Sequence, residues 1–141
     1  MEPLFTGSYN VAKDDYTSAG HASADIKRQL KQIGVGGDVL RRVAVASYEV
    51  ELNLVIHSLG GVLTLNVYPE CVQLISTDVG PGIPDLAMAM KEGYSTANET
   101  ARSLGFGAGM GLPNMKRNAD DFDIKSTVGV GTTITMGFKL A

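Results

Sequence analysis

The order of hydrophobic patterns along the chain limits its fold more than any other feature of the sequence. Before Gly60-Gly61 the apolar residues recur mainly at helical spacing, whereas short strand-like runs follow that pair. Strands and helices therefore do not alternate strictly, which argues against a doubly wound parallel sheet. The pattern favours an α+β fold, a two-layer sandwich with helices on one face of a mostly antiparallel sheet.

Capping residues and turn residues give the expected bounds of these elements. The sequence predicts helices over 14–33, 38–59, 86–90 and 110–118, and strands over 4–9, 62–68, 72–77, 122–127 and 132–140. We expect Asp14 and Asp15 to cap the first helix. The second helix carries an apolar stripe that must face the sheet, formed by Val39, Val43, Ala46, Val50 and Leu54. Cys71 is expected to be a small buried core residue.

Length and charge narrow the class of protein. A chain of 141 residues is the size of one domain, and we expect a single domain over 1–141. The formal net charge of -3 gives no excess of positive charge that would indicate binding to nucleic acid or to an anionic membrane. A single cysteine excludes an intrachain disulfide. Without a signal-peptide pattern or an apolar run long enough for a membrane span, the expected location is the cytoplasm.

Three polar residues of the second helix are spaced four apart: Glu49, Asn53 and His57. This spacing places them on one stripe beside the apolar stripe. A carboxylate in that position can accept a proton, and an amide oxygen one turn away is a hard ligand suited to Mg²⁺. The alternative is the solvated edge of an amphipathic helix, which the spacing alone favours.

An aspartate and two glycines follow a predicted strand, in the order Asp78-Val79-Gly80-Pro81-Gly82. An aspartate at a strand end can accept a hydrogen bond from an exocyclic amino group such as that of adenine. Gly80 and Gly82 would let the chain turn and let a flat ring approach the backbone. A plain Gly-Pro-Gly turn explains the same residues equally well.

Alternate glycines precede Leu112 and a predicted helix, at Gly105, Gly107, Gly109 and Gly111. Successive backbone N–H groups and a helix N-terminus together can hold phosphate oxygens. The segment lacks the Gly-Lys-Ser/Thr of a P-loop and the strand context of a dinucleotide fold. A flexible linker is the alternative, but the helix that follows at once favours a phosphate site.

These motifs occur in one order: Glu49-x-x-x-Asn53, Asp78-x-Gly80-x-Gly82, Gly105-x-Gly107-x-Gly109-x-Gly111-Leu112 and Gly129-x-Gly131-Thr132. Their order and spacing resemble the N, G1 and G2 boxes and the final threonine of the GHKL ATPases, the group of gyrase, Hsp90, histidine kinases and MutL. The resemblance covers roughly Val39 to Leu140.

A closer resemblance is to the stand-alone anti-sigma factors with serine-protein kinase activity, the switch kinases of bacterial stress-response modules. It is carried by the residues 78–85, 93–96 and 107–117. The chain departs from that pattern at 97–104, which look like an insertion before the glycines.

The resemblance implies a Bergerat-type ATP-binding fold, with ATP and Mg²⁺ as cofactors. It implies that Asp78 binds the adenine amino group, that Asn53 holds Mg²⁺ between the phosphates, and that Glu49 is the catalytic general base for a serine or threonine hydroxyl. The other nucleotide-binding residues that it implies are Gly80, Gly82, Gly105, Gly107, Gly109, Gly111, Leu112 and Thr132. His57 is given a structural role.

Two functions follow from the resemblance. In the first, the chain is a serine/threonine kinase that phosphorylates a STAS-type anti-anti-sigma protein. In the alternative, it is a nucleotide-gated binding module that sequesters a sigma factor or activates a PP2C-type phosphatase without essential kinase activity. A detached histidine kinase domain is disfavoured, because an N-terminal strand and helix complete the small domain. The family often forms homodimers, but the sequence locates no face for one.

Overall fold

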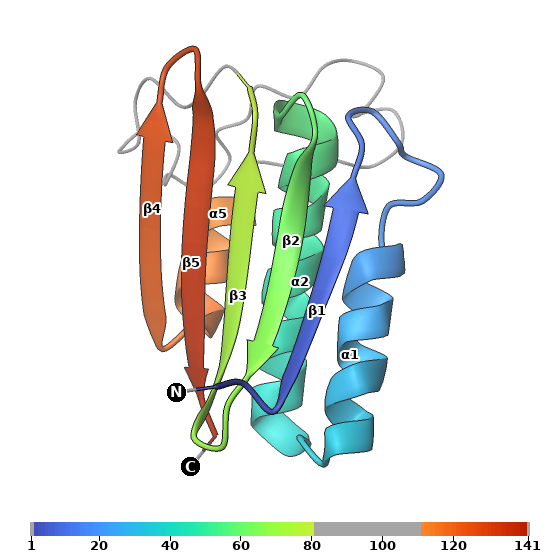
Figure 1. The fold of residues 1–141 in the computed structure, drawn as a ribbon, viewed down its shortest axis with the longest axis vertical. Helices are drawn as coiled ribbons and strands as arrows, with labels where there is room; N and C mark the ends of the chain where they lie inside the picture. Colours follow the sequence, from blue (N-terminus) through green and yellow to red (C-terminus); the bar gives the residue numbers. More distant parts are fainter. Residues whose placement is uncertain (1, 81–110, 141) are drawn as a thin grey trace.

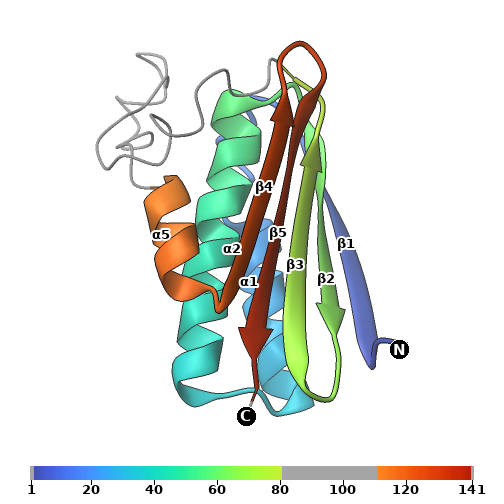
Figure 2. The ribbon, with the colours of Figure 1, turned by 90° about the vertical axis from the view of Figure 1, so that its left-hand side faces the viewer.

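The computed structural model describes residues 2–80 and 111–140, and it shows one sheet covered by helices. The elements in chain order are β1 (Phe5–Val11), α1 (His21–Ile33), α2 (Gly37–His57), β2 (Gly61–Val67), β3 (Cys71–Asp78), α5 (Gly111–Asn118), β4 (Asp121–Thr127) and β5 (Gly131–Lys139). The strands lie in the order β1-β2-β3-β5-β4, and every neighbouring pair is antiparallel. All of the described helices cover the same face of the sheet (Figures 1 and 2). The predicted α+β sandwich is confirmed.

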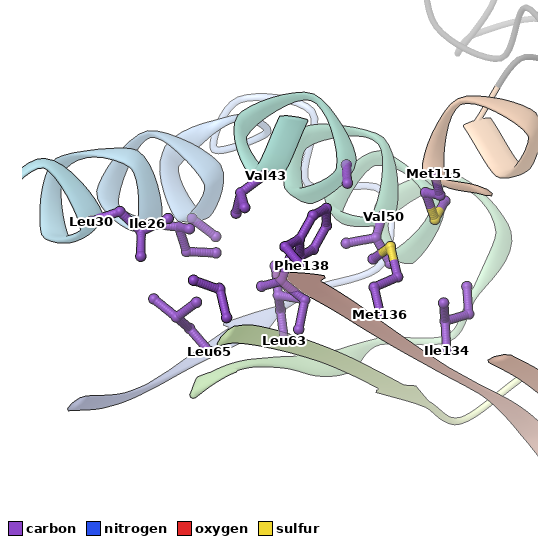
Figure 3. Packing of buried hydrophobic residues seen from close by; sticks show 14 of the residues in the cluster. Ile26, Leu30, Val43, Val50, Leu63, Leu65, Met115, Ile134, Met136 and Phe138 are labelled. Atoms are coloured by element: carbon purple, nitrogen blue, oxygen red, sulfur yellow. The ribbon is translucent and has the colours of Figure 1, made fainter. Parts of the chain in front are cut away.

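The core lies between α2 and the three central strands, because most of the buried side chains of both are apolar. In β5 the buried positions alternate with half-buried ones, so that Ile134, Met136 and Phe138 all point toward the helices. Figure 3 shows these side chains on the strand side of the core, across from Val50 of α2 and Met115 of α5. The remaining residues of the predicted stripe on α2 are buried, except for Val39, which is only partly buried.

The described strands, α2 and α5 lie within two residues of their predicted bounds, but the predicted start of α1 is wrong. Asp14 has a positive φ of 59°, and its N–H donates to the carbonyl of Val55. The side chain of Asp15 accepts the N–H of Ser18, so it closes a turn of the connecting loop instead of capping the helix. The helix begins only at His21.

The first amides of α1 are satisfied by a buried glutamate of α2. Glu51 is 2 % exposed, and its carboxylate accepts the N–H groups of Ala22 at 3.1 Å and Ser23 at 3.0 Å. A carboxylate at a helix N-terminus satisfies unpaired donors and interacts favourably with the helix dipole. This cap from a separate helix sets the start of α1 and fastens α1 to α2.

The structure also corrects the expected burial of Cys71. The residue is half-buried at the start of β3, while its neighbour Val72 is fully buried against the helices. Because successive side chains of a strand point to opposite faces, Cys71 lies on the open face of the sheet. The predicted helix over 86–90 lies outside the described residues. None of the described helices is long and apolar enough to span a bilayer.

Candidate nucleotide-binding site

Glu49 and Asn53 lie one turn apart on α2 and face the beginning of α5. A Cβ atom at Gly111 would lie 3.1 Å from Asn53 Oδ1 and 3.4 Å from Glu49 Oε2. A side chain at this position would therefore press on Asn53 Oδ1 and touch Glu49 Oε2, whereas glycine leaves room for both oxygens. The fold thus brings together two motifs that are far apart in the sequence.

The oxygen atoms of this pair suit a magnesium ion that arrives with a nucleotide. Amide and carboxylate oxygens are hard ligands, and Mg²⁺ in phosphate sites usually binds one or two protein oxygens together with phosphates and water. The described residues contain no group of three or more His, Cys, Asp or Glu side chains that could hold a metal by themselves. The donor set therefore fits Mg²⁺ bound jointly with phosphate.

Packing at both ends of α5 holds it against α2. Near its start, Leu112 is 7 % exposed and belongs to the hydrophobic core, together with the fully buried Met115. Its side chain is therefore used in packing, so the predicted role of Leu112 in nucleotide binding would require its backbone N–H. The first N–H groups of a helix lack intrahelical partners and favour anions such as phosphate.

At the other end of α5, Arg42 of α2 forms a bridge. Its side chain is only 19 % exposed. One guanidinium nitrogen donates to the carbonyl of Asn118 at 2.9 Å and to Asp120 at 3.4 Å, while Nε donates to Asp38 at 2.8 Å. The carbonyl of Asn118 lies at the negative end of the helix dipole, where a cation is favourable. Arg42 thus links α2 to the carboxyl end of α5.

Asp78 ends β3, where it is joined to the beginning of β5. Its Oδ1 accepts the backbone N–H of Thr132 at 2.8 Å. Its Oδ2 has no hydrogen bond to any residue in the described part of the chain, so one carboxylate oxygen is available to a ligand. Burial raises the pKa of the Asp78 carboxyl, and the hydrogen bond from the Thr132 N–H opposes that rise. The predicted acceptor and the predicted threonine therefore do lie together.

Thr132 is itself held in place by a neighbouring strand. It is 7 % exposed, and its hydroxyl lies 2.8 Å from the hydroxyl of Ser126 on β4. The pairing of β4 with β5 places Ser126 directly opposite Thr132. The resemblance does not point to Ser126, and only the strand register shows its position.

Gly131 is a residue of the site whose role the sequence did not show. Its φ is +155°, and a Cβ there would collide with the carbonyl oxygen of Asp78. Glycine is thus required for β5 to approach the end of β3. The signal for this role was the Gly129-x-Gly131-Thr132 motif, but the motif alone does not show which backbone Gly131 contacts.

Gly80 packs the chain after Asp78 against the end of α2. Its N–H donates to the carbonyl of Val130 at 3.2 Å, and a Cβ there would lie 3.3 Å from both Ser58 Cα and Leu59 N. In Figures 1 and 2 the carboxyl ends of α2 and β3 lie at the same end of the molecule. The predicted residues Gly82, Gly105, Gly107 and Gly109 lie outside the described residues.

The fold defines a structural class, an α+β domain with helices on one face of an open antiparallel sheet. Comparison with known families makes the assignment specific. The family model described as histidine kinase-, DNA gyrase B- and HSP90-like ATPase matches residues 38–141. The chain belongs to this family, and the resemblance inferred from its motifs is confirmed.

Three relatives indicate which members of this family the chain is similar to. The chain is 32% identical to the serine/threonine-protein kinase RsbT of Bacillus subtilis (strain 168), over 74% of this chain and 75% of that protein. It is 34% identical to the anti-sigma F factor of Bacillus licheniformis, over 69% of this chain and 67% of that protein. It is 31% identical to the anti-sigma F factor of Geobacillus kaustophilus (strain HTA426), over 74% and 72%. The predicted likeness to the kinases and anti-sigma factors of this family is confirmed, and with it the prediction of an enzyme.

Proposed function

We propose that the chain is an ATP- and Mg²⁺-dependent serine/threonine kinase that phosphorylates a STAS-type regulatory protein. The observation that carries the proposal is the close approach of Gly111 to Glu49 and Asn53, since an added Cβ there would lie within 3.4 Å of an oxygen of each. It unites a proton acceptor, a magnesium ligand and a helix N-terminus. The similarity to a relative named as a serine/threonine-protein kinase supports the same activity.

In this proposal the residues divide the work between binding and chemistry. Asp78 accepts the adenine amino group through Oδ2, since Thr132 already occupies Oδ1. The first amides of α5 receive phosphate oxygens, and Asn53 Oδ1 ligates Mg²⁺. The bound metal would neutralise charge on the phosphate oxygens.

Glu49 performs the proton transfer. The hydroxyl oxygen of a serine or threonine forms a bond to the γ-phosphorus while the bond to the bridging oxygen of ADP breaks. Glu49 takes the hydroxyl proton as the new bond forms, and ADP leaves. Removing a general base lowers the rate of the chemical step without weakening the ground-state binding of ATP.

The test is phosphate incorporation into a purified STAS-domain protein from labelled ATP. We expect Glu49→Gln to lower the rate about 10²–10⁴-fold and to leave ATP affinity unchanged. Glu70→Gln is the matched control, because Glu70 is exposed in the turn between β2 and β3. Unaltered incorporation by Glu49→Gln would falsify the assignment of the base.

The relatives named anti-sigma F factor favour a second candidate function. In that function the chain binds a sigma factor when it holds nucleotide, and phosphorylation is secondary. Tight ATP-dependent binding of a sigma factor, with no incorporation into a STAS-domain protein by the wild-type chain, would select this function. Such binding should persist in Glu49→Gln, because that variant keeps the nucleotide site.

A further inference from the structure

A hydrogen bond from α5 reaches the carboxylate of Glu49. Asn114 lies one turn after Gly111, and its Nδ2 donates to Glu49 Oε1 at 3.3 Å in a partly buried setting. Hydrogen bonds at catalytic groups are often long before substrate binds. The contact is made from the same helix that brings Gly111 to the other carboxylate oxygen, Oε2.

The orientation of the Asn114 amide is determined by its second partner. Arg117, one turn further along α5, donates from Nη1 to Asn114 Oδ1 at 3.0 Å. A guanidinium only donates, so it must take the amide oxygen, and an ionised carboxylate only accepts, so it must take the amide NH₂. The two contacts agree on one orientation of the amide.

The hydrogen bond makes the two oxygens of Glu49 different. Oε1 is engaged by Asn114, whereas Oε2 has no hydrogen bond to any residue within 2–80 or 111–140. The terminal torsion of a glutamate side chain is broad, so an unrestrained carboxylate samples many orientations. With Oε1 held, Oε2 remains directed toward Gly111.

We propose that Asn114 is a positioning residue that holds Glu49 with Oε2 presented to the attacking hydroxyl group. The inference rests on the proposed role of Glu49 as general base. Asn114 touches no reacting atom, and its effect passes through the carboxylate. A fixed base reacts faster than one that must first find its orientation, because the entropy of orientation is lost before the reaction begins.

A double-mutant cycle separates positioning from a structural effect. The probe is single-turnover hydrolysis of labelled Mg²⁺–ATP, in which water replaces the serine hydroxyl and Glu49 takes its proton. We expect Asn114→Ala to lower this rate about tenfold, which corresponds to about 1.4 kcal/mol, with the Kd for ATP changed less than about twofold. In the Glu49→Gln background the same substitution should change the rate less than about twofold.

Asn118→Ala is the matched control. Asn118 is on the same helix, and its side chain donates to the carbonyl of Asn114 at 2.8 Å instead of to Glu49. This variant should hydrolyse ATP at the wild-type rate. An equal loss from Asn114→Ala in both backgrounds, or no loss at all, would overturn the positioning role. Those results leave the kinase proposal intact, because it is tested separately with the STAS-domain protein.

A second readout needs no turnover. The side-chain amide resonances of Asn114 in a ¹H–¹⁵N spectrum should shift in Glu49→Gln and stay in place in Glu70→Gln. If the resonances are unmoved in Glu49→Gln, the contact does not exist in solution and the inference fails. This measurement decides the matter even for a chain that hydrolyses ATP too slowly to assay.

Discussion

Replacing Gly131 with alanine should disturb both the stability of the chain and its nucleotide site. The added Cβ would collide with the carbonyl oxygen of Asp78 and would lie 3.0 Å from Asp78 C and 3.2 Å from Asp78 Oδ1. The obstacle is the backbone of a paired strand, which cannot rotate away as a side chain can. The φ of +155° adds strain, since residues other than glycine rarely adopt it.

The two effects give the size of the loss. A backbone conformation of this kind costs about 1–3 kcal/mol, and overpacking costs about as much again. We therefore expect Gly131→Ala to lower the free energy of unfolding by about 2–6 kcal/mol. Such a loss is a large fraction of the total stability of a small domain, which is about 5–15 kcal/mol.

Gly129→Ala provides the control for the collision. Gly129 lies in the same β4–β5 turn with a φ of +81°, but a Cβ there would meet nothing within 4 Å. This variant should lose only the cost of its backbone conformation, about 1–2 kcal/mol. A clearly larger loss in Gly131→Ala than in Gly129→Ala therefore indicates the collision with Asp78.

Urea unfolding followed by circular dichroism would measure both losses, and calorimetric titration with ATP would measure the consequence for the site. Where Gly131→Ala still folds, the displaced Asp78 should weaken ATP binding at least about tenfold, whereas Gly129→Ala should bind normally. If Gly131→Ala is as stable as Gly129→Ala, the close approach of β5 to Asp78 is not a constraint and the reasoning is refuted.

Three further predictions concern the residues proposed to bind the nucleotide and its magnesium ion. Asp78→Asn should weaken ATP binding by more than about 1.5 kcal/mol, because an amide replaces a charged acceptor, and unchanged affinity by calorimetry in a folded variant would contradict the adenine assignment. Burial raises the pKa of Asp78, so on acidification its carboxyl should gain a proton at a higher pH than an ordinary aspartate, and ATP affinity should fall with it. In the same pH range the ATP affinity of Asp78→Asn should not change. Equal pH dependence of ATP affinity in the two proteins would count against the role of Asp78. Asn53→Ala should make ATP affinity nearly insensitive to magnesium, whereas the wild-type chain should bind more tightly when the metal is added; an equal response in both would reduce Asn53 to a helix-surface residue.

The sequence by itself determined most of the described elements and the inner faces of α2 and β5. The apolar stripe of α2 and the alternation of β5 were predictable because each depends on residues within a turn or two of one another. The order of the motifs was also enough to recognise the family, which the family model then confirmed. These are properties that can be read along one stretch of chain at a time.

Only the tertiary structure decided where α1 begins and how the candidate site is joined. The start of α1 depends on Glu51, which is buried on a different helix. A prediction from neighbouring residues alone therefore placed the cap wrongly at Asp14 and Asp15. The contact of Gly131 with Asp78 depends on the register of β5 against β3, and that of Asn114 with Glu49 depends on the packing of α5 on α2. Hydrophobic periodicity specifies which face of an element is buried. It does not specify which polar groups of two elements meet, because that requires the separation and alignment that packing produces.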